Sequence, residues 1–211
     1  MWTRIIHRVV VVLQELAYTA NQFIATLQQH GLVVLLWLGI AFAVQILNIS
    51  TNYKLNVLGI YPRHWYGLIG IITSPFIHGN WGHFISNAAM FVIMSLFVLA
   101  QGIDVYITVT LMIMVLSGLM VWLLARRALH IGASGVIMGY FGFIVVSAIA
   151  HPSIVNISLT IVCLYYFGSM FMNLFPSGAK VSWEGHVFGF ISGIVVSFSY
   201  PIVISFLHHP I

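Results

Sequence analysis

Residues 132–150 read GASGVIMGYFGFIVVSAIA, which places Ser134 at the head of a predominantly apolar stretch. A second apolar stretch begins with Gly185-His186 and runs to Leu207. A polar side chain in hydrocarbon costs several kcal/mol by order of magnitude unless it is paired or used in chemistry. We therefore interpret Ser134 and His186 as a nucleophile and a base that meet inside a membrane.

The composition of the whole chain agrees with a membrane location. Of its 211 residues, 61% are hydrophobic and 5% are charged, and the mean hydropathy is +1.08. Soluble domains carry about 25% charged residues, so we expect an integral membrane protein whose length fits one domain. The net charge of +4 comes from seven scattered basic residues, which excludes a nucleic-acid partner. The single cysteine, Cys163, lies in an apolar stretch and is expected to pack as a small hydrophobe.

Six stretches approach the length of about 20 apolar residues that a membrane span needs. They lack the alternation of barrel strands, so we predict an all-α, polytopic bundle of six transmembrane helices. The predicted spans are Leu32–Leu47, Phe84–Ala100, Val105–Ala125, Ser134–Ala150, Ile157–Phe175 and Val187–Leu207. The fourth span is short, at seventeen residues. If it starts below the membrane surface, Ser134 lies in a water-accessible depression.

Two segments outside the spans differ in character. Residues 1–30 hold only a short apolar run, Val9–Leu13, and no cleavage site follows it, so we expect an interfacial amphipathic helix. Residues 31–211 then form the six-helix domain. About 35 residues separate the first two spans, and they are rich in aromatic and aliphatic side chains. We expect them to form a lobe partly sunk into the outer leaflet.

A polar cluster precedes the second span. His78, His83 and Asn87 lie in the segment His78–Asn87, and His83 and Asn87 are four residues apart, so they share one face of a helix. The Asn87 amide, the His83 ring and the backbone N–H of Ser134 could donate hydrogen bonds to an oxyanion. The start of a helix at Ser134 adds a favourable partial positive charge.

Glycines follow both Ser134 and His186 at the spacing of close helix contacts. Gly135 and Gly139 form one G-x-x-x-G pair, and Gly189 and Gly193 form another. Small residues at this spacing let two membrane helices approach closely. We expect the fourth and sixth spans to pack together and to bring Ser134 to His186.

The chain has three acidic residues, Glu15, Asp104 and Glu184. We place Glu184 in the loop before the last span and expect no acid to orient the His186 imidazole. The pattern therefore favours a Ser–His dyad over a three-residue arrangement. There is no H-E-x-x-H motif, and no carboxylate neighbours His78 or His83 in sequence, so we expect neither a metal nor another cofactor.

Together these motifs resemble the rhomboid family of intramembrane serine proteases, over residues 32–207. The matching patterns are the H-x-x-x-x-H-x-x-x-N set at His78, His83 and Asn87, the G-x-S-G at Ser134, and the G-H-x-x-G-x-x-x-G at His186. Two positions depart from the family. Met138 stands where many members have an aromatic residue beneath the histidine, and Trp65 is followed by Tyr66 instead of arginine.

The resemblance implies a function and a role for each site residue. Ser134 is the nucleophile and His186 the base, while Gly132 belongs to the turn before the serine. His83 and Asn87 belong to the oxyanion hole, and His78 supports that region. The substrates are then transmembrane proteins in a lipid bilayer, here of a bacterial inner membrane. An N-in topology is also implied, with the site open to the extracytoplasmic side, although the distribution of basic residues favours the reverse orientation.

Other functions remain open at this point. The chain could be a catalytically weak or inactive rhomboid-like protein that binds client transmembrane helices, or a specialised member that processes a C-terminal sorting tail. A transporter is disfavoured by the few acids and the lack of paired broken spans. The missing H-E-x-x-H disfavours a metalloprotease. The sequence predicts neither the natural substrate nor the oligomeric state.

Overall fold

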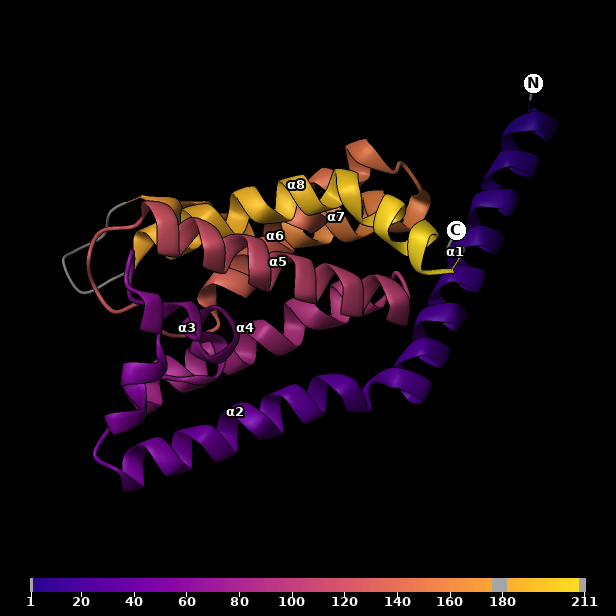
Figure 1. Cartoon of the computed structure of the whole chain (residues 1–211). Coiled ribbons are helices and arrows are strands. Elements are labelled where there is room, and N and C mark those ends of the chain that lie inside the picture. The colour runs from indigo at the N-terminus through magenta and orange to yellow at the C-terminus, as the bar shows by residue number, and fades with distance from the viewer. Residues whose placement is uncertain (1, 176–181, 209–211) are drawn as a thin grey trace.

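The computed structural model describes residues 2–175 and 182–208, which form eight α-helices and four short 3-10 helices (Figure 1). The α-helices are α1 (Trp2–His30), α2 (Leu32–Ser50), α3 (Gly70–Thr73), α4 (Trp81–Leu99), α5 (Ile103–Leu124), α6 (Ser134–Ala150), α7 (Ile154–Phe167) and α8 (Trp183–His208). The 3-10 helices are η1 (Lys54–Leu58), η2 (Trp65–Leu68), η3 (Ser74–Phe76) and η4 (Gly168–Leu174). The all-α prediction is confirmed.

Five helical segments within the described residues are long and apolar enough to cross a membrane. They are α2, α4, α5, the segment Ile154–Met172, which consists of α7 and most of η4, and α8. The sixth predicted span, α6, is apolar but only 17 residues long. The chain is therefore an integral membrane protein whose helices match the six predicted spans.

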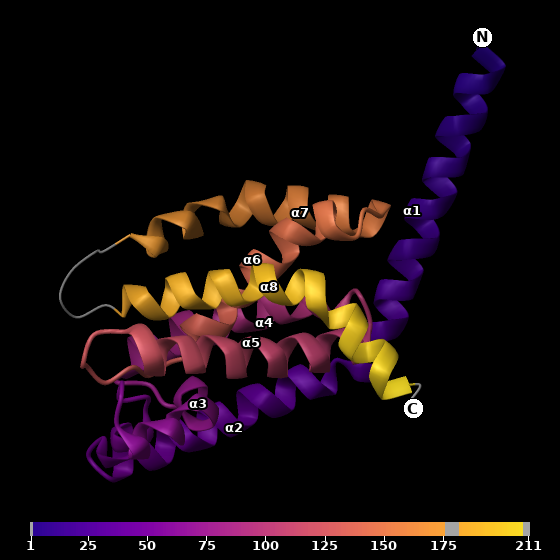
Figure 2. The same cartoon turned by 45° about the horizontal axis from the view of Figure 1, so that its top comes forward.

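Helix α6 lies at the centre of the bundle. It packs against α4, α5, α7 and α8, and Figures 1 and 2 show it enclosed by these helices. Every residue from Val136 to Ile144 is buried, so the helix has no lipid-facing side in this stretch. A helix that is apolar all round belongs in such a position. Its first residue, Ser134, therefore stands at one end of the core of the protein.

The glycine pairs bring α6 and α8 into backbone contact, as the sequence predicts. A Cβ atom built on Gly189 would overlap the carbonyl oxygen of Gly135, and one built on Gly193 would overlap that of Gly139. Only glycine fits at these two positions of α8, because any side chain would push the helices apart. The contact fixes the distance between the helices that carry Ser134 and His186.

The loop between α2 and α4 folds into a lobe over the same end of the bundle. Backbone hydrogen bonds of 2.9 Å in both directions join Ile60 to His130, which lies between α5 and α6. Ile71 and Ile77 are buried, whereas Trp65 is 83% exposed. An apolar exposed surface is what the sequence predicts for this lobe; its immersion in the outer leaflet stays a prediction.

Residues 2–30 form one continuous helix, α1, which leaves the bundle at an angle to α2 (Figures 1 and 2). Apolar side chains are exposed along it, including Trp2, Ile6 and Leu13. The helix agrees with the predicted amphipathic segment. Its position at the membrane interface, and the division into residues 1–30 and 31–211, remain predictions.

Candidate active site

Ser134 is the first residue of α6 and follows a turn that requires glycine. Gly132 has a φ of +107°, a backbone conformation that side chains disfavour. Its N–H donates to the carbonyl of Ser74 at 2.9 Å, which ties the turn to the lobe between α2 and α4. The turn thus places Ser134 at the N-terminal end of α6. As in the first turn of any helix, the backbone N–H of this residue does not take part in the hydrogen bonds within the helix.

His83 and Asn87 lie on the first two turns of α4, beside this turn. The side chain of Asn80 caps α4 by accepting the N–H of His83 at 2.8 Å. A Cβ atom built on Gly132 would stand 2.7 Å from Nε2 of His83 and 3.2 Å from Nδ2 of Asn87. Both side chains therefore reach the backbone just before Ser134, on the shared face that the sequence predicts.

His186 lies in the first turn of α8 and is half-buried. It shares a cavity of about 700 Å³ with Ser134, His83 and Asn87. His83 and His186 are close enough to interact electrostatically. The structure thus gathers the predicted nucleophile, the predicted base and the two predicted oxyanion donors around one space.

The Asn87 amide is suited to binding a negatively charged oxygen. Its Nδ2 atom is buried and has no hydrogen-bond partner among the described residues. A buried donor without a partner costs free energy, so a retained one points to a role in the site. The amide could donate to an oxygen that enters the cavity.

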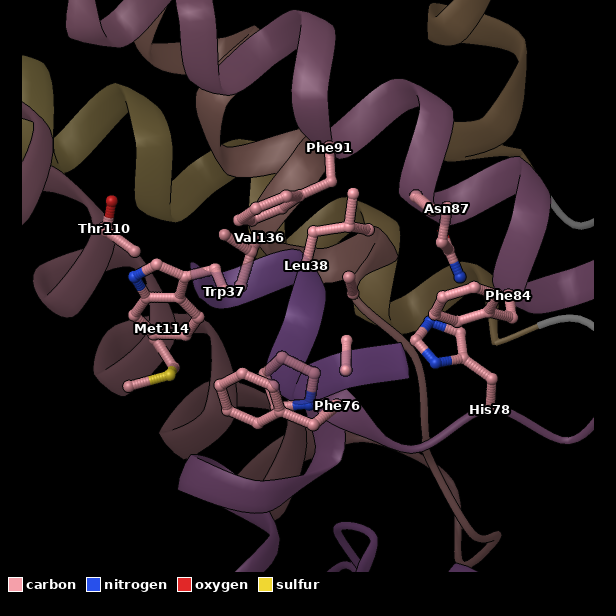
Figure 3. A pocket seen from close by; sticks show the side chains of 14 residues that line it. Trp37, Leu38, Phe76, His78, Phe84, Asn87, Phe91, Thr110, Met114 and Val136 are labelled. Atoms are coloured by element: carbon pink, nitrogen blue, oxygen red, sulfur yellow. The ribbon is translucent and has the colours of Figure 1, made fainter. Parts of the chain in front are cut away.

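His78 lies behind these groups and does not line the cavity that holds Ser134. Figure 3 shows it with Phe84 and Asn87 at one end of an apolar pocket between α2, α4, α5 and α6. Its ring contacts those of His83 and Phe84 edge-on, at centroid distances of 5.1 and 5.4 Å. Burial, reinforced by the neighbouring His83, lowers the pKa of His78 to about 4, so the ring is neutral at physiological pH. This position agrees with a supporting role.

The family resemblance places Met138 beneath the histidine. It is almost fully buried and lines the same cavity as His186, together with Phe167 and Met170. Tyr140 instead lies in the core, where its hydroxyl bonds with that of Thr110 at 2.7 Å. The side chain expected beneath His186 is thus a flexible thioether.

Sequence reasoning missed a second polar cluster beside the site. Glu184, predicted to lie in a loop, is in the first turn of α8, is buried, and pairs with Arg126 at 3.4 Å. His130, which we expected at the membrane interface because a lone histidine at the edge of a span usually lies there, is also buried. Its Nδ1 bonds with the hydroxyl of Ser182. Both corrections have one cause: the α5–α6 connection folds back over the start of α8. The nearness of an acid to His186 in sequence was the signal available.

The described residues hold no group of three or more His, Cys, Asp or Glu side chains that could bind a metal ion. That the chain works without a cofactor stays a prediction.

The sequence of the chain matches the model of one protein family. The family model described as the rhomboid domain matches residues 63–201, a range that includes every predicted site residue. An uncharacterized protein of Mycobacterium tuberculosis is 28% identical to the chain, over 80% of this chain and 74% of that protein. An uncharacterized protein of Mycobacterium leprae is 27% identical, over 80% of this chain and 70% of its own length.

Proposed function

The chain belongs to the rhomboid family, and we propose that it is an intramembrane serine endopeptidase that cleaves membrane-anchored proteins within or near their transmembrane segment. One observation carries the proposal: Ser134, His186, His83 and Asn87, which come from three helices, line a single cavity. The cavity sits at the end of a helix that is buried in the bundle.

In the proposed reaction, His186 takes the proton of the Ser134 hydroxyl as the oxygen attacks the carbonyl carbon of the scissile peptide bond. The peptide C–N bond then breaks, and the imidazolium returns the proton to the leaving amine. Water hydrolyses the acyl-enzyme in a second round with the same groups. His186 must be neutral to begin the cycle, because only the neutral imidazole can accept the proton.

The negative charge that develops on the carbonyl oxygen needs donors. The Asn87 amide, the His83 ring and the backbone N–H of Ser134 are the donors proposed for it. The positive end of the α6 dipole adds to their effect at the same place. Gly132 serves the arrangement by its lack of a side chain, since a Cβ there would contact both His83 and Asn87.

The substrates proposed are single-span or multi-span membrane proteins, reached within the lipid bilayer. The proposed location is a bacterial inner membrane, with the N-terminus inside and the site open to the extracytoplasmic side. Support comes from family membership and from the bacterial source of the relatives.

A second candidate is a catalytically weak or inactive rhomboid-like protein that binds client transmembrane helices. Met138 favours it, because a flexible side chain beneath His186 holds the imidazole less rigidly than an aromatic ring. The two candidates differ in whether the peptide bond is broken.

The test is to reconstitute the purified protein in liposomes with a panel of single-span substrates and to detect fragments by mass spectrometry. We expect fragments from the wild type and none from Ser134→Ala or His186→Ala. Ser199→Ala is the matched control, because this serine lies on α8 away from the site and its hydroxyl bonds to the carbonyl of Val195. Retention of cleavage by Ser134→Ala contradicts the proposal. Substrate binding by the wild type without fragments favours the second candidate.

A further inference from the structure

The start of α8 is joined to the α5–α6 connection by two polar contacts that the proposed chemistry does not use. Glu184 is only 6% exposed, and its Oε1 lies 3.4 Å from Nε of Arg126. Two residues earlier, the hydroxyl of Ser182 bonds with Nδ1 of His130. An acid this well buried is retained only when it is paired.

The connection that holds these residues is itself fixed. His130 exchanges two backbone hydrogen bonds with Ile60, and its Nε2 lies 3.2 Å from the carbonyl of Arg126. Arg126 and His130 therefore sit on a segment braced against the lobe between α2 and α4. The first turn of α8 is attached to this braced segment.

The contact between α8 and α6 leaves the first turn of α8 in need of a second contact that fixes its angle. Gly189 and Gly193 face the backbone of α6, and the carbonyl oxygen of Gly185 lies 3.4 Å from a Cβ atom built on Gly135 at the start of the same face. Glycines allow a close approach but offer no side chain to resist rotation of one helix against the other. Farther along α8, the ring of Phe190 packs against that of Phe141 on α6 and fixes the angle of that part of the helix. The first turn, which carries Glu184 and His186, has only the glycine contact on this face and needs another contact to fix its angle.

Glu184 and His186 lie on opposite flanks of that glycine face. Successive residues of an α-helix are about 100° apart, so the two side chains stand about 100° to either side of Gly185. A rotation of α8 that frees Glu184 from Arg126 therefore swings His186 relative to Ser134. The pairing of Glu184 with Arg126 on one flank therefore fixes the direction of the His186 imidazole on the other flank.

We propose that Glu184 and Arg126 are positioning residues that set the angle of α8 and so aim His186 at Ser134. This inference rests on the proposed function. The acid acts through the helix that carries the base and not on the imidazole itself, which compensates for the flexible support that Met138 gives. His130 assists by its bond to Ser182, the residue just before α8.

The test uses Glu184→Gln, Arg126→Gln, the double variant and Arg126→Lys, each in liposomes with one cleaved substrate. Turnover is expressed per mole of folded protein, taken from the monodisperse peak in size-exclusion chromatography, so aggregated protein is not counted. Arg127→Gln is the matched control, since it removes the same charge from an exposed neighbour. A small displacement of a catalytic group is costly, so we expect kcat to fall about 10-fold in both single variants with KM within two-fold.

The pattern across the variants identifies the pair. The double variant should be no slower than Arg126→Gln, because the two residues act as one unit. Arg126→Lys should recover most of the rate, since it retains the charge, and Arg127→Gln should match the wild type. Unchanged kcat per mole of folded protein in Glu184→Gln overturns the proposal, and so does a rise in KM alone.

Hydrogen exchange over residues 182–190 supplies a readout that does not need proteolysis. We expect faster exchange there in Glu184→Gln and Arg126→Gln than in Arg127→Gln. If the wild type cleaves and exchange is the same in all three, the positioning role is overturned while the proposed function stands. If the wild type shows no Ser134-dependent cleavage, the proposed function is wrong and the positioning role falls with it.

Discussion

The α-carbon of Gly132 lies so close to His83 that a Cβ atom built on it would stand 2.7 Å from Nε2 of the ring. Real Cβ atoms do not approach a ring nitrogen so closely, so a side chain at Gly132 would displace His83. The turn before Ser134 and the first turn of α4 are thus matched to each other.

Gly132→Ala is expected to lower kcat at least 10-fold, because the methyl group displaces the His83 ring and crowds Asn87. It also forces a non-glycine residue to a φ of +107°, which costs on the order of 1 kcal/mol of stability. Gly102→Ala separates the two effects, since Gly102 has a φ of +114° and nothing described lies within 4 Å of its Cβ position. Equal turnover in the two variants would show that the contact with His83 does not matter.

Asn87→Ala is expected to lower kcat by about 10²–10³, as removal of one oxyanion donor does, with little change in melting temperature. The reason is that Nδ2 of Asn87 has no described partner to lose. Asn48→Ala provides the contrast, since Asn48 bonds to Asn56, Leu55 and the carbonyl of His78. It should lose about 1–3 kcal/mol of stability. A destabilised Asn87→Ala with normal turnover would assign Asn87 to packing.

The lowered pKa of His78 makes the stability of the fold depend on pH. Its pKa is about 4 in the folded protein and about 6.5 when unfolded, so between these values the unfolded state binds more protons. Stability should therefore fall as the pH is lowered from about 6.5 to about 4, with no further loss from this group below that. The melting temperature of His78→Leu should depend less on pH than that of the wild type over this window. Parallel pH profiles would contradict the assignment.

Gly193→Leu is expected to destabilise the fold by about 3 kcal/mol or more, because its side chain must separate α8 from α6 at the carbonyl of Gly139. Gly39→Leu is the control, since Gly39 lies on α2 with nothing described within 4 Å of its Cβ position. Thermal unfolding of both variants in the same detergent measures the difference. Similar melting temperatures would show that the α6–α8 contact is less close than described.

The spans could be predicted because lipid allows few solutions. A run of apolar residues must become a helix there, so the bounds of α6 follow from Ser134 and Ala150 directly. The face shared by His83 and Asn87 follows from helix periodicity, and the α6–α8 contact follows from glycine spacing. Each of these depends on local sequence alone.

Glu184 and His130 could not be placed in the same way. Their burial depends on the α5–α6 connection folding over the start of α8 and pairing with Ile60, which is seventy residues from His130. The spacing of apolar residues along the sequence predicts helices but does not predict a contact between two distant loops. An isolated acid two residues from a predicted base therefore looked like a loop residue.

The proposed chemistry depends on the activation of Ser134 by His186. Its most direct measurement is the reaction of the purified, lipid-reconstituted protein with a fluorophosphonate, followed by peptide mapping of the adduct. We expect one adduct on Ser134 in the wild type and almost none in His186→Ala, whose serine lacks its base. Absence of an adduct from the wild type, attachment to another serine, or equal labelling of His186→Ala would contradict it.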